Sequence, residues 1–372
     1  MSPARIAGRR GGDPRGRRAR FSPVRPRGPG TGPRGNAMTR SVPSPSSPRA
    51  VAPSSSDGFK SSGQSPGRTL HLVGPGQVGR AFLRQFASRA GRAPRLVAVS
   101  DASGTVYDRG GLAPSELLAY KDGGGRLGEL ANAEAVPTEL AIRVVAADVV
   151  VDATPSTLAD TDAAVQRARA ALQVAGALVL CSKNGLARCA AEWLSPRDRA
   201  RVGMHAALGG TGANLVRELD ELRRECREVA LVGNVATTKV ITAIERGRSL
   251  AEGIAEAQRC GFLEPDPALD LDGSDAAVKL LCVVGAVFGD TFTRPPALAA
   301  VKREDLRALD PELLRTRAAR GATTRLVARA TRGGDLRVTF EELPLGAPLA
   351  APPDRVVYGY RLPAGLRVHT GL

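Results

Sequence analysis

The residues best able to do chemistry lie in one short stretch, 262–279, which reads FLEPDPALDLDGSDAAVK. It holds carboxylates and one amine: Glu264, Asp266, Asp270, Asp272, Asp275 and Lys279. An apolar run after Gly273 predicts a buried helix with Ser274 as its N-cap. Asp275 and Lys279, four residues apart, then share one helix face, where an ammonium can donate a proton and stabilise negative charge. The alternative is a solvated loop with aspartates favoured at a helix N-terminus, followed by an ordinary ion pair.

A second chemical motif is the glycine pattern GPGQVG at 74–79, which stands between a β-run and an amphipathic helix. Its glycines allow a tight turn and close approach to a pyrophosphate at the helix N-terminus. Asp101 ends the next β-run, where an acid can hold an adenosine ribose hydroxyl. This context predicts dinucleotide binding. The choice between NAD and NADP stays open, because Arg109 or Lys121 could serve a 2′-phosphate.

Polar residues also follow two further predicted strands. The run ADVVVDATPST at 147–157 reads as a buried parallel strand that ends near Asp152 and leads into Thr154, Pro155 and Ser156. The next strand ends just before Lys183. Ligands of a doubly wound sheet lie beyond the carboxyl ends of its strands, so 154–156 and 182–184 are expected at the nicotinamide end. The alternative for Lys183 is a solvated loop lysine.

These elements predict an α/β fold: a Rossmann-like doubly wound parallel sheet plus a second, α+β domain. Residues 1–68 are rich in Arg, Pro, Gly and Ser and are expected to be a disordered tail. We expect the dinucleotide-binding domain over 69–203 and the substrate domain over 204–340. Residues 341–372 are expected to return to the cofactor-binding domain.

The charge distribution limits the classes of partner. The net charge is +16, but the first 68 residues contribute fourteen Lys and Arg against two Asp. The rest is nearly balanced, which argues against a nucleic-acid-binding domain, although a weak RNA-binding tail, a transit peptide or a mis-assigned start before Met38 are alternatives for the leader. No run is long and apolar enough to span a membrane. Five cysteines without a CxxC pair indicate reduced thiols and a cytoplasmic location, and no metal site is expected.

Taken together, the motifs resemble those of homoserine dehydrogenase, over roughly residues 69–371. The resemblance rests on GPGQVG at 74–79, VSDASGTVYDRGGL at 99–112, VVVDATPS at 149–156, CSKNGLA at 181–187 and, most specifically, GFLEPDPALDLDGSDAAVKL at 261–280. The resemblance is to a minimal form of homoserine dehydrogenase that has no regulatory domain.

The resemblance implies a reversible, NAD- or NADP-dependent interconversion of aspartate 4-semialdehyde and homoserine, in the threonine and methionine branch of amino-acid biosynthesis. It implies Lys279 and Lys183 as catalytic lysines, with Asp275 orienting Lys279. It implies a homodimer through the second domain. The implied substrate-binding residues are Glu264, Asp270 and Thr237, and the implied cofactor-binding residues are Gly74, Gly76, Gln77, Val78, Gly79, Asp101, Thr154, Pro155 and Ser156.

Several positions depart from the family pattern. Ser182 stands where the family has Asn before the site lysine, and His205 or Ala206 replaces a glutamate beside a cation-binding loop. We expect His205 to be a core histidine rather than a catalytic one. The family's NGTTN turn reads VATTK, which places Lys239 near the site. The chain stops at VHTGL, where the family continues with a glycine-rich turn. Two alternatives follow: an oxidoreductase for another small amino-acid-like substrate, or a silent dinucleotide-binding paralogue.

Overall fold

The first sheet is built around the strand that precedes the glycine turn. The computed structural model describes residues 67–88, 94–156, 161–263 and 266–371, all within one compact unit, Ser62–Leu372. The strand order is β4-β3-β2-β1-β5-β6-β7. These strands are β1 (Thr69–Val73), β2 (Arg95–Asp101), β3 (Gly104–Tyr107), β4 (Ala133–Glu134), β5 (Val149–Asp152), β6 (Ala177–Leu180) and β7 (Val202–Gly203). Strands β2, β1, β5, β6 and β7 run parallel, whereas β3 and β4 extend the sheet antiparallel.

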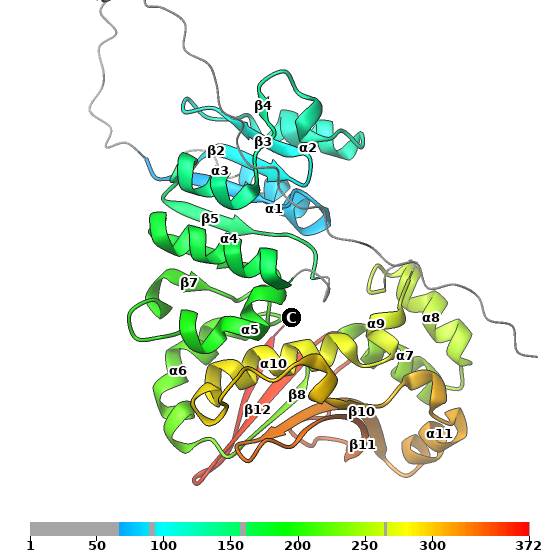
Figure 1. The fold of residues 1–372 in the computed structure, drawn as a ribbon. Coiled ribbons are helices and arrows are strands. Elements are labelled where there is room, and N and C mark those ends of the chain that lie inside the picture. Colours follow the sequence, from blue (N-terminus) through cyan, green and yellow to red (C-terminus); the bar gives the residue numbers. More distant parts are fainter. Residues whose placement is uncertain (1–66, 89–93, 157–160, 264–265, 372) are drawn as a thin grey trace, which may run out of the picture. The chain divides into compact units, whose positions relative to one another are not determined.

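The parallel strands are short apolar runs, as expected for strands that helices cover. Helix α1 packs against α2, while α3, α4 and α5 pack side by side (Figure 1). The helices are α1 (Gln77–Ala87), α2 (Pro114–Asp122), α3 (Thr138–Val145), α4 (Thr161–Val174) and α5 (Asn184–Trp193). This arrangement confirms the predicted Rossmann-like architecture.

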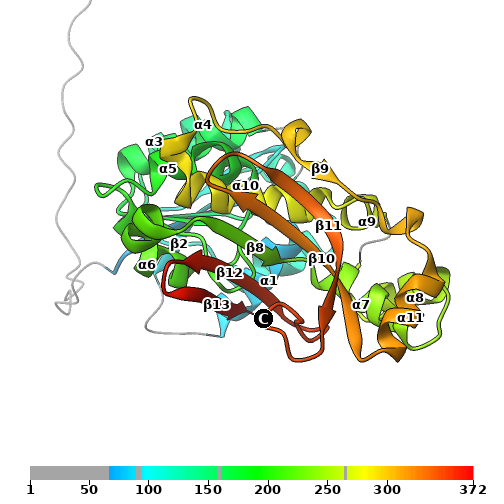
Figure 2. The same cartoon turned by 90° about the horizontal axis from the view of Figure 1, so that it is seen from below.

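The second sheet is mainly antiparallel and carries helices on the face that meets the main core. Its strand order is β13-β12-β8-β10-β11-β9, and Figure 2 shows it from below with α10 behind it. The strands are β8 (Glu228–Val232), β9 (Lys302–Arg303), β10 (Ala322–Thr331), β11 (Leu336–Pro344), β12 (Val356–Leu362) and β13 (Gly365–Gly371). The helices are α6 (Gly212–Glu225), α7 (Val235–Glu245), α8 (Leu250–Arg259), α9 (Ala268–Leu271), α10 (Ser274–Val287) and α11 (Pro311–Ala319).

Helix α10 joins the two sheets. Its residues are almost all buried, and it packs against α5 on one side and against β8 and β10 on the other. The predicted start of this helix is confirmed, but the predicted cap is wrong. Gly273 is the N-cap, with a left-handed φ of 75°, and the Ser274 amide donates to Oδ1 of Asp272 at 2.8 Å. Glycine adopts this φ without strain, so the chain can turn sharply into α10.

The last two strands lie in the second sheet, whereas the sequence analysis expects 341–372 to return to the cofactor-binding unit. Strand β12 pairs antiparallel with both β8 and β13. The reason is the alternation in β12, because Tyr358, Tyr360 and Leu362 project into the main core. An alternating strand of this kind is stabilised by pairing inside a sheet. The division near residue 203 stays a prediction.

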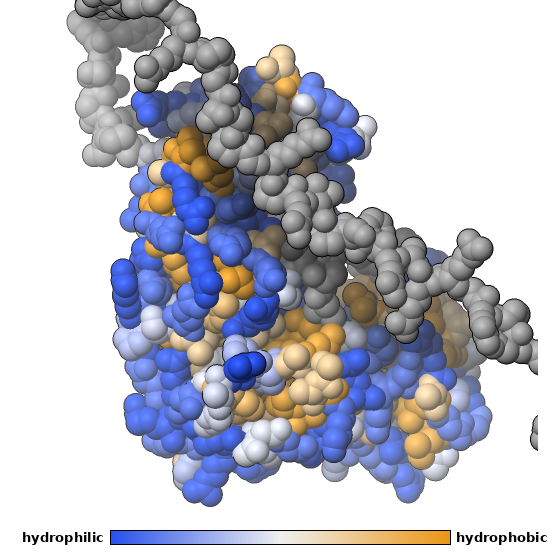
Figure 3. Space-filling model, in the orientation of Figure 1, coloured by the Kyte–Doolittle hydropathy of each residue, from blue (hydrophilic) through white to orange (hydrophobic). Residues whose placement is uncertain are grey.

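On the face drawn in Figure 3, hydrophobic residues form patches over α3, α4 and α5 and near α10, among a mainly hydrophilic surface. No helix within the described residues is long and apolar enough to cross a membrane.

Candidate active site

A cleft of about 950 Å³ opens between the carboxyl edge of the first sheet and the acidic segment that precedes α10. Residues from four distant parts of the sequence line it. They are Gly76, Gln77, Val78, Ala153, Thr154, Pro155, Ser156, Cys181, Lys183, Phe262, Asp266, Leu269, Asp270, Asp275 and Val278. The structure therefore brings the predicted nicotinamide-end residues together with the predicted acids.

The glycine turn has the shape that a dinucleotide phosphate needs. Gly74 has φ of 82°, and a Cβ there would lie 2.6 Å from the amide nitrogen of Thr154. A Cβ on Gly79 would lie 2.3 Å from the carbonyl oxygen of Gly74. At Gly76, by contrast, a Cβ would meet no atom within 4 Å, and no side chain caps α1, which begins at Gln77. The free amide groups of the α1 N-terminus therefore face open space, where a phosphate can approach them.

The loop after β5 is held by a buried ion pair. Asp152 accepts hydrogen bonds from the Thr154 amide (3.0 Å) and hydroxyl (2.6 Å) and from Nε of Arg167 (3.2 Å). Arg167 also donates to the Thr154 hydroxyl at 3.0 Å. Two residues further along, the Ser156 hydroxyl accepts from the Lys183 amide at 3.1 Å. Thr154 and Ser156 are thus fixed at the cleft by their neighbours.

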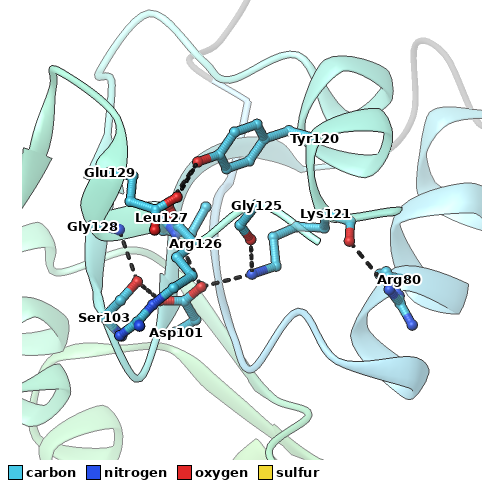
Figure 4. A network of polar contacts seen from close by, with 10 residues as sticks. All are labelled: Arg80, Asp101, Ser103, Tyr120, Lys121, Gly125, Arg126, Leu127, Gly128 and Glu129. Atoms are coloured by element: carbon cyan, nitrogen blue, oxygen red, sulfur yellow. Dashed lines mark hydrogen bonds and ion pairs between the residues drawn. The ribbon is translucent and has the colours of Figure 1, made fainter. Parts of the chain in front are cut away.

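Asp101 lies at the end of β2, as predicted, but its carboxylate is already engaged. Oδ2 accepts from the Lys121 ammonium (2.8 Å) and the Leu127 amide (3.1 Å), while Oδ1 accepts from the Ser103 amide and hydroxyl (Figure 4). Burial favours the neutral acid, but these bonds outweigh it, and they lower the pKa of Asp101 to about 2. A carboxylate has about four acceptor positions, so none is left over for a ribose hydroxyl.

The catalytic lysines predicted from sequence meet at one carboxylate. The Lys279 ammonium lies 2.7 Å from Oδ2 of Asp275 and donates to the Gly233 carbonyl at 2.6 Å. The Lys183 ammonium lies 3.5 Å from Oδ1 of Asp275. Burial favours the neutral form of Asp275, but the two ammonium charges outweigh it, so its pKa is lowered. Asp275 is therefore a carboxylate held between two cations.

Asn234 is the site residue that the sequence analysis missed. Its amide nitrogen donates to Oδ1 of Asp270 at 2.8 Å and to Oδ2 of Asp275 at 3.0 Å. Its side-chain oxygen accepts from the Thr237 amide at 2.9 Å and so caps α7. The available signal was an Asn placed directly after a buried strand and before a helix, which is an N-cap position. One buried side chain thereby joins the start of α7 to two carboxylates.

The carboxylate of Asp270 faces the cleft beside that of Asp275. Burial raises its pKa, as does the neighbouring charge of Asp275, while Asn234 and the two lysines oppose that shift. The hydroxyl of Thr237 donates to the backbone carbonyl of Asp270 at 2.9 Å, which fixes the α9 turn. The predicted acid Glu264 lies outside the described residues.

The structure also places two residues from the segments that depart from the family pattern, His205 and Lys239. His205 is exposed, so the expectation of a core histidine is wrong, and its Nδ1 accepts from the Ala213 amide at 3.3 Å near the start of α6. The first amide groups of a helix have no partner within it, and the exposed His205 side chain supplies one for the Ala213 amide. The Lys239 ammonium lies 4.0 Å from the ring centre of Phe262, which lines the cleft.

Comparison with known proteins shows which families the sequence resembles. The profile of the family described as homoserine dehydrogenase matches residues 214–357, and that of glutamate/leucine/phenylalanine/valine dehydrogenase matches residues 57–182. The homoserine dehydrogenase of Methanocaldococcus jannaschii is 26% identical over 293 residues, which cover 75% of this chain and 84% of that protein. The NAD(+)-dependent homoserine dehydrogenase of Pseudomonas canavaninivorans is 26% identical over 72% of this chain and 78% of its own length.

A solved structure supports the fold as well. A hyperthermophilic archaeal homoserine dehydrogenase in complex with NADPH superposes with a TM-score of 0.63 at 22% identity, covering 82% of this chain and 91% of that one. The profile match and the curated relatives indicate an NAD(P)-dependent oxidoreductase. More narrowly, the chain resembles homoserine dehydrogenases: the family profile matches residues 214–357, and the two relatives above are 26% identical to it.

Proposed function

We propose that the protein catalyses the reversible, NAD(P)-dependent interconversion of aspartate 4-semialdehyde and homoserine, in the threonine and methionine branch of amino-acid synthesis. The observation that carries this proposal is the ionised Asp275, held between Lys183 and Lys279 in a cleft that also contains the glycine turn. Charged donors of this kind suit a reaction that develops negative charge on a carbonyl oxygen.

The two lysines would act on the carbonyl oxygen of the aldehyde. When bound, the reduced nicotinamide supplies a hydride to the carbonyl carbon, and the oxygen then needs a proton. An ammonium has three hydrogens, and Lys279 uses two of them on Asp275 and Gly233. The third is free to reach the substrate. Lys183, in its longer ion pair, is the more weakly held of the two, and either ammonium can donate the proton.

The acids would hold the amino group of the substrate. Asp270 faces the cleft, and it stays close to Asp275 because Asn234 bonds to both carboxylates. A substrate ammonium would offset the mutual repulsion of these charges. Thr237 contributes indirectly, because it fixes the backbone of Asp270. We retain Glu264 as a predicted substrate ligand.

For the cofactor, we propose that NADP is used better than NAD. Because the Asp101 carboxylate is fully engaged, it is a poor acceptor for the ribose hydroxyls that distinguish NAD. The Lys121 ammonium beside it donates to Asp101 and to the Gly125 carbonyl, which leaves one hydrogen for a 2′-phosphate.

The decisive experiment measures oxidation of NADPH and of NADH by the full chain with aspartate 4-semialdehyde. We expect turnover with both cofactors and a higher kcat/KM with NADPH. Cofactor binding without turnover of this aldehyde would contradict the proposed reaction and favour the divergent or silent alternatives. Equal or better use of NADH would contradict the cofactor assignment alone.

A further inference from the structure

A second cavity lies apart from the cleft, between α7 and α8, and the proposed reaction makes no use of it. Its volume is about 300 Å³. The residues that line it are Lys239, Thr242, Ala243, Arg246, Arg248, Gly253, Glu256, Ala257, Cys260 and Pro353. Gly253 lets the two helices approach closely, because a Cβ there would lie 3.2 Å from the Val240 carbonyl oxygen. The space is therefore suited to a small ligand.

The lining of this cavity is strongly cationic. Lys239, Arg246 and Arg248 face one acid, Glu256, so the lining carries a net charge of +2. Arg248 has a long ion pair of 3.9 Å with Glu252 on the surface. Within the described part of the chain, neither Lys239 nor Arg246 forms an ion pair. The cations of the lining therefore exceed its one acid, Glu256.

Thr242 lies on the same wall, but its hydroxyl is not open to the cavity. Its hydroxyl oxygen is shielded from solvent, yet it makes no hydrogen bond to any described residue. Buried hydroxyls are nearly always hydrogen-bonded, and a helical threonine can usually satisfy itself on the preceding turn. Thr242 lies one turn from both Lys239 and Arg246 on α7, so the three side chains belong to the same wall of the cavity.

We propose that this cavity binds a small dianion of the size of inorganic phosphate. Lys239 and Arg246, which form no ion pair with any described residue, would hold its charge. Arginine suits this role because its planar guanidinium can form two parallel hydrogen bonds to an oxyanion. Arg248 would complete the site from the loop between the two helices.

The dianion site is joined to the active-site cleft through Lys239. Its ammonium now rests on the ring of Phe262, 4.0 Å from the centroid, and Phe262 lines the cleft. An exposed cation–π contact is weaker than a charge-assisted hydrogen bond to an oxyanion. A bound dianion would therefore draw Lys239 away and release the Phe262 ring. Because linkage is reciprocal, the dianion and the amino-acid substrate must then alter each other's affinity by the same factor.

Calorimetric titration of the full chain with inorganic phosphate tests the site without any substrate. We expect saturable binding that Arg246→Gln weakens by about 10-fold or more, which corresponds to one lost charge-assisted contact. The matched control is Arg259→Gln, which removes the same charge from an exposed position on α8 outside the cavity. Absence of binding, or equal weakening in both variants, would overturn the proposal.

The position of the bound phosphate can be checked at Cys260. This exposed thiol lines the cavity, and it can be alkylated with iodoacetamide and quantified by mass spectrometry. We expect phosphate to slow alkylation of Cys260 in the unmodified protein and in Arg259→Gln, but not in Arg246→Gln. Protection that persists in Arg246→Gln would place the phosphate elsewhere and refute the assignment.

The coupling rests on the proposed function and has its own readout. Phosphate should change the KM for aspartate 4-semialdehyde relative to sodium chloride at equal ionic strength, and Phe262→Leu should abolish this response while phosphate binding persists. A KM response of the same size in Arg246→Gln would contradict the coupling. If the aldehyde is not turned over at all, the proposed function fails, whereas calorimetry and alkylation still decide the dianion site.

Discussion

The two walls of the cleft are built by different means. The cofactor wall, residues 74–79 and 153–156, offers mainly backbone atoms, and its shape depends on positions where a Cβ would collide with the chain. The acid wall presents Asp270 and Asp275 to the cleft, and Asn234 and Lys279 hold these carboxylates by short hydrogen bonds. Steric fit determines the shape of the cofactor wall, whereas the balance of charges holds the acid wall together.

The two walls should therefore tolerate different substitutions. A backbone site survives changes of side chain except at the few glycines that define the turn. A network of charges fails when any member is removed, because the remaining charges lose the partner that offsets their burial.

The largest effect is expected for Lys279→Ala. Loss of an ammonium that donates to the developing alkoxide should lower kcat by about 10²–10⁴-fold with little change in cofactor affinity. Steady-state kinetics and cofactor titration by fluorescence measure the two quantities. Lys302→Ala, an exposed lysine on β9, is the control and should retain full activity. Unchanged kcat in Lys279→Ala would show that the acid wall is not the catalytic one.

Two glycine substitutions should separate shape from stability in the cofactor wall. Gly76→Ala adds a methyl that meets no protein atom, so thermal unfolding should be unchanged while cofactor affinity falls by about 10- to 100-fold, because backbone contacts to phosphate are lost. Gly74→Ala should instead destabilise the protein, because φ is 82° and the Thr154 backbone is in the way. Equal loss of stability in both would contradict this division.

Asn234→Ser should weaken the acid wall without unfolding α7. Serine caps a helix as well as asparagine does, but it cannot bond to Asp270 and Asp275 together. We expect kcat/KM for the aldehyde to fall by about 10- to 100-fold while the melting temperature stays nearly constant. Asn132→Ser, at an exposed position, controls for the chemical change. A large loss of stability together with unchanged kcat/KM would assign Asn234 a capping role alone.

Lys121→Ala should alter cofactor choice. Removing this ammonium frees one acceptor position of Asp101 for a ribose hydroxyl and removes a cation from the 2′-phosphate. The ratio of kcat/KM for NADPH to that for NADH should therefore fall by about 10-fold. Both constants come from the same preparation, so partial unfolding cancels in the ratio. An unchanged or higher ratio would contradict the proposed role of Lys121.

The smallest effect is a shift in pH dependence. Asp270 must be ionised to bind the substrate ammonium, and burial raises its pKa. Lowering the pH should therefore raise KM for the aldehyde at pH values where an ordinary aspartate is still ionised. Asn234→Ser removes a hydrogen bond that favours the carboxylate, so the rise in KM should begin at a higher pH. Identical KM profiles for the two proteins would argue against Asp270 as the ammonium ligand.

The cofactor wall was predictable because its determinants are local in sequence. The turn at 74–79 needs glycine at fixed offsets, and the strand before it and helix after it supply the context. The ends of β5 and β6 were predictable for a similar reason, since the carboxyl edge of a parallel sheet collects ligand contacts. The pairing of Asp275 with Lys279 followed from helical spacing alone.

Other features depend on contacts between residues far apart in the chain. Oδ1 of Asp101 is engaged by the neighbouring Ser103, but the partners of Oδ2, Lys121 and Leu127, lie 20 and 26 positions away. Its sequence position at a strand end could not reveal that the whole carboxylate was engaged. Asn234 bonds to acids 36 and 41 positions away, and no local pattern encodes that pairing. The placement of β12 beside β8 likewise follows from core packing rather than from a motif.

The packing of α10 on α5 has a consequence for how the protein assembles. Lys183 precedes α5 and Asp275 begins α10, so their ion pair can form only after the chain between them has folded and the two helices have docked. Closing so long a loop is slow compared with forming its helices. On refolding from denaturant, helical structure should therefore return well before enzymatic activity, which makes activity a sensor of the final docking step.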